Sequence, residues 1–139
     1  MPTYNFSDFI QCCADQAVFI WDPALKTAAD DFGIHGQDRL QEFIAEGGLE
    51  DLAFVVSETF RNWKGKPPIP VVDSYTFTTG TKDGYFAFFR NPDVGIFNLK
   101  SFKLNEDAKP HNFVFKELFK TQQIRLAPEK EEGNEGTNG

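Results

Sequence analysis

The sequence has few cysteines, no long apolar run and no excess of positive charge, and each of these absences narrows the class of protein. Its two cysteines, Cys12 and Cys13, are adjacent, so they cannot cross-link distant segments and are expected to be reduced. No apolar run approaches the roughly 18 residues that a membrane-spanning helix needs. The first residues show no signal peptide. We therefore expect a cytoplasmic protein that does not contact a membrane.

The sequence motifs of several common enzyme classes are also missing. It contains no glycine-rich phosphate loop, no dinucleotide-binding fingerprint and no serine in a nucleophile-elbow frame. Its two histidines, His35 and His111, are far apart, and no pair of side chains has the spacing of metal ligands. We therefore expect neither a cofactor nor a metal ion.

Aromatic residues, by contrast, are abundant. The 139 residues include 16 Phe, and 40% of the chain is hydrophobic, which excludes disorder for most of its length. This length is typical of one domain. We expect a single domain over residues 1–128. Residues 129–139 are rich in Glu, Gly and Asn, contain no apolar residue, and are expected to be a disordered acidic tail.

The first half of the chain has helical patterns. Ser7 is the expected cap of a first helix, and Pro23 and Gly33 mark the two ends of a second. A third helix is expected over residues 37–46, where the apolar positions follow helical spacing up to a Gly-Gly pair. The apolar run over residues 17–21 fits either a short strand or a packed connector.

The segment over residues 49–60 fits two elements. Leu52, Val56 and Phe60 repeat every four residues and favour a helix, whereas the consecutive apolar residues 54–56 would also fit a strand. We prefer the helix.

The second half of the chain has the patterns of strands. Three strands are expected over residues 71–79, 85–90 and 96–103, joined by Gly- and Pro-containing turns as an antiparallel meander. Helical spacing returns over residues 113–124, where a C-terminal helix can form. The expected fold class is α+β, with N-terminal helices packed on a small antiparallel sheet.

Charge is divided unevenly between the two halves. The net charge is −7, yet residues 61–128 hold eleven Lys or Arg against six Asp or Glu, whereas residues 1–60 hold two against eleven. Cations interleaved with aromatic residues suit phosphate contact and base stacking. The RNA-binding residues expected from this pattern are Arg61, Lys64, Arg90 and Lys100. The simpler alternative is that the two halves neutralise each other and that edge lysines prevent aggregation.

Several short segments resemble the MqsR-like toxins, which belong to the RelE-type superfamily of mRNA-cleaving toxins. The resemblance runs in order over residues 6–103. Its clearest parts are residues 28–34, Asp73-Ser74-Tyr75, Tyr85 and Ser101-Phe102-Lys103.

This resemblance implies a RelE-like fold, in which helices pack on an antiparallel sheet whose surface holds RNA. It also implies a metal-independent endoribonuclease whose catalytic set contains two lysines, a glutamine and a tyrosine. Tyr85 and Lys103 match two of these positions, whereas Val56 and Val72 stand at the other two. The partners implied are RNA and an antitoxin protein, with no direct contact to DNA.

Two other functions remain open from the sequence. The apolar residues at positions 56 and 72 favour a protein-binding module without catalytic activity on the same scaffold. The many phenylalanines could instead line a pocket for a small molecule. The sequence does not choose an oligomeric state.

Overall fold

The computed structural model describes residues 1–106, of which Met1–Asn105 form one compact unit. The three helices and five strands are α1 (Phe6–Ala14), β1 (Phe19–Ile20), α2 (Asp22–Phe32), α3 (Gln37–Ala45), β2 (Glu50–Thr59), β3 (Val71–Thr79), β4 (Lys82–Arg90) and β5 (Phe97–Leu104). The helix expected over residues 113–124, the domain boundary at residue 128 and the acidic tail lie outside the described residues. No helix within residues 1–106 is both long and apolar enough to cross a membrane.

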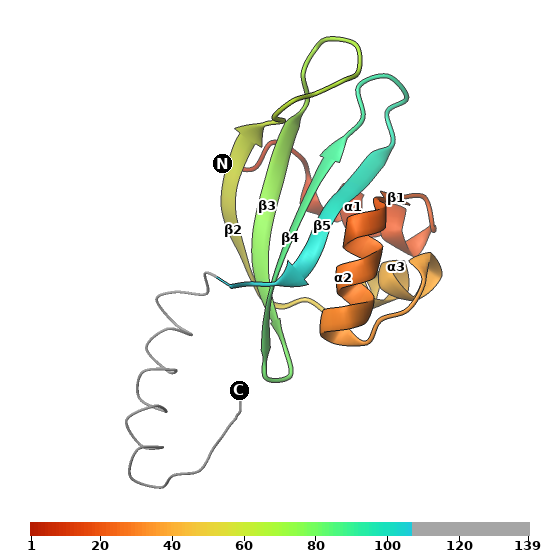
Figure 1. Cartoon of the computed structure of the whole chain (residues 1–139), viewed down its shortest axis with the longest axis vertical. Coiled ribbons are helices and arrows are strands. Elements are labelled where there is room, and N and C mark those ends of the chain that lie inside the picture. The colour runs from red at the N-terminus through yellow and green to blue at the C-terminus, as the bar shows by residue number, and fades with distance from the viewer. Residues whose placement is uncertain (107–139) are drawn as a thin grey trace, which may run out of the picture. The chain divides into compact units, whose positions relative to one another are not determined.

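All five strands belong to one sheet, with the order β1-β5-β4-β3-β2 (Figure 1). Strands β2 to β5 pair antiparallel, whereas β1 pairs parallel to β5. The expectation of a small antiparallel sheet of the RelE-like kind is therefore wrong, because the sheet is mixed and has five strands. The fold is α+β with a mostly antiparallel sheet, and β4 lies at its centre.

Strand β2 is the main correction to the predicted elements, since a helix was preferred over residues 49–60. Its inward side chains Phe54 and Ser57 are three residues apart, because the register against β3 shifts between Phe54 and Val56. Val55 is the extra residue of this β-bulge. A spacing of three resembles the spacing of a helix, and this explains the wrong prediction.

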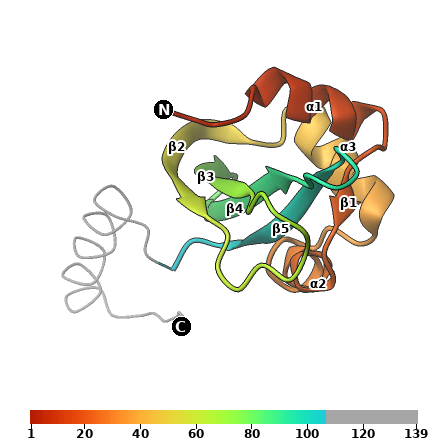
Figure 2. The ribbon, with the colours of Figure 1, turned by 90° about the horizontal axis from the view of Figure 1, so that it is seen from above.

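The helices were predicted at the correct places. Helix α2 has Pro23 in its first turn and ends at Gly33, whose φ of 69° is a left-handed conformation that favours glycine. Helix α1 is capped by Asn5 rather than by the expected Ser7, because the Asn5 side chain accepts a hydrogen bond from the Asp8 backbone N–H. Helices α1 and α3 cover one face of the sheet, and α2 lies beside β5 (Figure 2).

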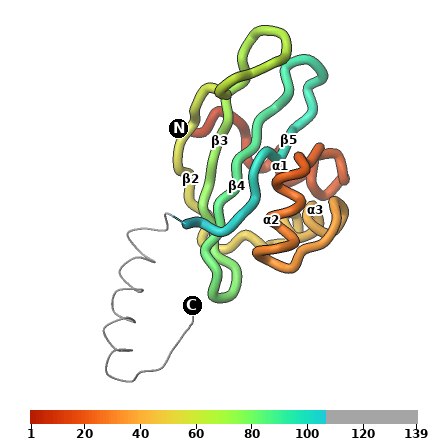
Figure 3. The backbone as a smooth tube through the Cα atoms, in the orientation of Figure 1, coloured from red at the N-terminus to blue at the C-terminus, as the bar shows by residue number. Residues whose placement is uncertain are grey.

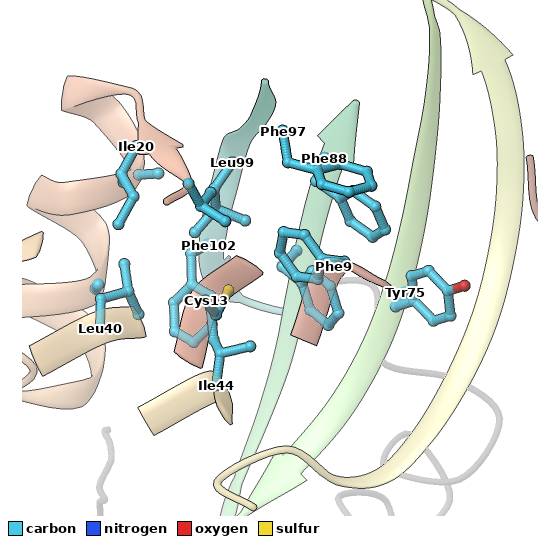
Figure 4. Close-up of a cluster of buried hydrophobic side chains, with 14 of the residues drawn as sticks. Phe9, Cys13, Ile20, Leu40, Ile44, Tyr75, Phe88, Phe97, Leu99 and Phe102 are labelled. Atoms are coloured by element: carbon cyan, nitrogen blue, oxygen red, sulfur yellow. The ribbon is translucent and has the colours of Figure 1, made fainter. Parts of the chain in front are cut away.

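The core lies between this face of the sheet and helices α1 and α3, and phenylalanine dominates it (Figure 4). The rings of Phe9 on α1 and Phe88 on β4 are stacked with their centroids 3.9 Å apart. Phe86 and Phe102 are fully buried beside them. The abundance of phenylalanine is thus explained by the packing of helices on the sheet.

Asp73 on β3 is a buried carboxylate on the same helix-covered face. Its Oδ2 accepts hydrogen bonds from the backbone N–H groups of Thr3 and Tyr4, both at 2.9 Å. The Ser57 hydroxyl donates to its Oδ1 at 2.5 Å. Asp73 therefore fastens the N-terminal segment to strands β2 and β3.

Candidate functional site

The face of the sheet opposite α1 and α3 is the candidate site, and we call it the open face. Figure 1 looks onto this face, with α2 beside β5. Side chains alternate along a strand, so Tyr85 and Phe89 of β4 leave the sheet on the side opposite to the core residues Phe86 and Phe88. No described helix crosses strands β3 and β4 on this side (Figure 2).

The two residues matched to the toxin family, Tyr85 and Lys103, are direct neighbours on the open face. They are paired across β4 and β5, and the Lys103 Nζ lies 5.7 Å from the centroid of the Tyr85 ring. Tyr85 is half-buried and Lys103 is exposed. The pair therefore presents a phenol and an ammonium group side by side.

Lys100 reaches the open face through an irregularity that the sequence did not reveal. Ala87 pairs with Ser101 and Phe88 pairs with Leu99, so Lys100 is the extra residue of a bulge in β5. Its Nζ lies 5.4 Å from the centroid of the Phe60 ring. The bulge thus adds a second cation to the face that carries Lys103.

A second group of aromatic side chains, which we call the aromatic cluster, lies on the open face where β4 ends and the β2–β3 loop begins. It consists of Trp21, Phe60, Trp63 and Phe89, and the ring centroids of five pairs of these side chains lie 5.1–5.8 Å apart. Phe89 is fully buried beneath the other three, which are half-buried.

Buried polar groups hold the aromatic cluster in place. The Trp21 Nε1 donates a hydrogen bond of 2.9 Å to the Asn98 Oδ1 on β5. The Asn98 amide in turn donates to the Ile96 carbonyl at 3.0 Å. Each tryptophan contacts both Phe60 and Phe89, and Trp21 is also held to β5 because its backbone N–H donates to the Leu99 carbonyl at 3.0 Å.

The loop over residues 60–70 joins β2 to β3 and carries three cations, Arg61, Lys64 and Lys66. It extends past the end of the sheet (Figure 3). The Phe60 backbone N–H donates to the Pro70 carbonyl at 3.0 Å, and the Trp63 Nε1 donates to the Lys66 carbonyl at 3.0 Å. Arg61 and Lys64 are exposed, and in the chain they directly follow Phe60 and Trp63 of the aromatic cluster.

Arg90 is the predicted RNA-binding residue that the structure separates from the others. Its guanidinium carbon lies 4.6 Å from the centroid of the Phe97 ring, which belongs to the core face. Tyr85 and Lys103 lie on the opposite face of the sheet. Tyr85 and Arg90 are five positions apart in one strand, so the alternation of side chains along β4 puts them on opposite faces.

No carboxylate among the described residues forms an ion pair with the cations at the site, although Glu58 and Asp83 also lie on the open face by alternation. Within residues 1–106 the one ion pair joins Lys26 to Asp30 on α2. Lys100 and Lys103 therefore lie beside aromatic rings with no described carboxylate within 4.0 Å of their Nζ atoms. Arg61 and Lys64 likewise have no described carboxylate within 4.0 Å.

Val56 and Val72 also lie on the open face, by alternation with the inward residues of β2 and β3. Val56 pairs with Ser74, and Val72 pairs with Glu58. All four positions singled out by the family resemblance thus lie on one face of neighbouring strands. The two valines add neither a cation nor an amide to this face.

The structure gives little support for a small-molecule pocket, a metal site or a reactive thiol among the described residues. A surface hollow is lined by residues 35–39, between α2 and α3, and no phenylalanine borders it. Among the described residues, no group of three or more His, Cys, Asp or Glu side chains is arranged to hold a metal ion. Burial, together with the neighbouring Cys12, raises the pKa of the Cys13 thiol to about 12.

The chain was compared with protein-family models, with curated proteins and with solved structures, and no match was found in any of the three. The chemistry of the open face is therefore the basis for a functional proposal.

Proposed function

We propose that the open face binds single-stranded RNA. The observation that carries this proposal is the combination of Lys100 and Lys103, without carboxylate partners among the described residues, and half-buried aromatic rings on the same face. Cations contact the phosphates of a nucleic acid, and aromatic rings stack on its unpaired bases.

The phosphate contacts are assigned to the cations of β5 and the β2–β3 loop. Lys100 and Lys103 lie along the strand, whereas Arg61 and Lys64 lie past its end beside the aromatic cluster. A strand rises by about 3.3 Å per residue, so the four steps from Tyr85 to Phe89 span about 13 Å. A short stretch of RNA can therefore contact both ends of the open face.

The base contacts are assigned to Trp21, Phe60 and Trp63. Unpaired bases stack on such rings without strong sequence preference, which contributes about 1–3 kcal/mol per base. A duplex hides the flat faces of its bases, so the aromatic cluster favours single strands over duplexes.

Cleavage of the bound RNA is a second candidate activity, and it rests on the Tyr85–Lys103 pair. In such a reaction the 2′-hydroxyl loses its proton to solvent, its oxygen attacks the adjacent phosphorus, and the bond to the leaving 5′-oxygen breaks. Lys103 would stabilise the negative charge on the phosphate oxygens, and Tyr85 would donate a proton to the leaving oxygen. Val56 and Val72 supply no base for the 2′-hydroxyl. We therefore expect the bound RNA to be cleaved slowly.

The protein's two tryptophans provide the test, because both belong to the aromatic cluster. Addition of a single-stranded oligoribonucleotide should quench their fluorescence, and an oligomer of the same length with abasic sites should quench it less. Unchanged fluorescence together with no measurable affinity would contradict the proposal. Incubation with labelled RNA, for wild type and for the Tyr85→Phe and Lys103→Ala variants, tests cleavage separately.

A protein partner is the competing function, and the apolar Val56 and Val72 favour it. The antitoxin implied by the family resemblance would be a partner of this kind. A purified partner that binds the open face while RNA does not would replace the RNA proposal.

A further inference from the structure

The outer edge of β2 is a second surface of the molecule that can bind a partner, because β2 is an edge strand. Strand β2 is the last strand of the sheet order, and it pairs with β3 on one side only. Its ten residues therefore leave a row of backbone N–H and C=O groups without a strand partner among the described residues.

The centre of this edge is apolar and exposed. Leu52, Val55 and Val56 are 38%, 49% and 38% exposed, and residues 52–56 contain no charged side chain. Proteins usually protect an edge strand with lysine, proline or an inward charge, and this run has none of them. The bulge at Val55 interrupts the edge but leaves this valine 49% exposed.

The charges at the two ends of β2 have opposite signs. The strand begins with Glu50 and Asp51, whereas Arg61 and Lys64 follow its end and outweigh the single Glu58 there. In an antiparallel pair of two identical strands, the beginning of one copy lies against the end of the other. A two-fold axis at Val55 or Val56 places Glu50 opposite residue 60 or 62 of the second copy, next to its Arg61.

We propose that a second copy of this chain binds the outer edge of β2, so that two sheets join through antiparallel β2 strands. The apolar centre of each strand covers that of the other, and each acidic end meets a basic end. The bulges shorten the regular part of the seam, so we expect a dimer that dissociates on dilution.

The oligomeric state of the full chain, measured without RNA over a range of protein concentrations by light scattering, tests this inference. The wild type should convert from monomer to dimer as concentration rises. Val55→Lys should raise the dimer dissociation constant by at least about tenfold. Val94→Lys is the matched control, because Val94 is 64% exposed in the β4–β5 loop, and it should leave the dissociation constant unchanged.

A charge-exchange experiment separates this two-fold pairing from other self-association. Glu50→Lys should weaken the dimer, because it places a lysine next to Arg61 of the second copy, and the double variant Glu50→Lys/Arg61→Glu should restore it. Circular dichroism and thermal unfolding confirm that each variant is folded. A monomer at every concentration, equal dimers for Val55→Lys and wild type, or no restoration in the double variant would overturn the proposal.

Discussion

At the scale of single residues, Asp73 explains how the N-terminal segment is fixed to the sheet. Its carboxylate is fully buried and accepts hydrogen bonds from two backbone N–H groups and one hydroxyl. A buried carboxylate is tolerated only with such partners, because it has lost its hydration. The alternation of side chains along β3 puts Asp73 and Tyr75 on one face, and the structure shows that this face is the buried one.

Replacing Asp73 should destabilise the fold. In the Asp73→Ala variant the N–H groups of Thr3 and Tyr4 and the Ser57 hydroxyl lose their acceptor, and we expect the free energy of unfolding to fall by about 2–4 kcal/mol. Urea unfolding measures this loss. Asp93→Ala, at an exposed loop position, is the control and should change stability by less than about 0.5 kcal/mol. Equal stability of the two variants would show that Asp73 does not anchor the segment.

The two adjacent cysteines should differ in reactivity. Burial, with the neighbouring Cys12 as a second cause, raises the pKa of Cys13 to about 12, so its reactive thiolate is scarce at every pH below that value. A thiol reagent at pH 8 should therefore label Cys12 in the native protein and Cys13 only after unfolding. In the Cys12→Ser variant, native labelling should disappear. Rapid native labelling of that variant would contradict the buried position of Cys13.

At the scale of elements, β-bulges decide where sequence patterns fail. The strand over residues 71–79 has regular alternation and was predicted with its correct bounds. Strand β2 was missed because the bulge at Val55 changes the spacing of its inward residues from two to three. A bulge is set by the neighbouring strand, so one segment of sequence does not reveal it.

The pairing of β3 with β4 depends on a glycine. Gly84 is opposite Phe77, and a Cβ atom at position 84 would overlap the Phe77 ring. Phe77 is only 1% exposed, so its ring has little room to move. Gly84→Ala should therefore lower the free energy of unfolding by about 1–3 kcal/mol, as measured by urea unfolding.

The neighbouring turn supplies the control for this prediction. Thr81→Ala lies at an exposed position between the same two strands and should have little effect. If Gly84→Ala were as stable as Thr81→Ala, the close packing of Phe77 on the glycine would be refuted.

At the scale of the whole molecule, the net charge of −7 does not reveal that the open face carries the cations Lys100 and Lys103. The sequence correctly indicated cations in the second half, and Tyr85 and Lys103 were predicted from a family resemblance that the comparisons do not test. It could not show that Lys100 joins them through a bulge. The aromatic cluster brings together residues from the junction between β1 and α2, from β4 and from the β2–β3 loop, and such long-range contacts are not encoded in any local pattern.

The arrangement of charge predicts where RNA affinity should be sensitive. Lys103 lies on the open face, whereas Arg39 lies on α3, which covers the other face. A charge reversal at either position changes the net charge equally. Only the reversal on the open face should act directly on bound phosphates.

The most direct measurement is therefore the dissociation constant of a fluorescent single-stranded oligoribonucleotide at fixed salt, for wild type, Lys103→Glu and Arg39→Glu. We expect Lys103→Glu to weaken binding by about tenfold or more, and Arg39→Glu by less than about threefold. Equal losses in the two variants, or no binding by the wild type, would contradict the assignment of RNA binding to the open face.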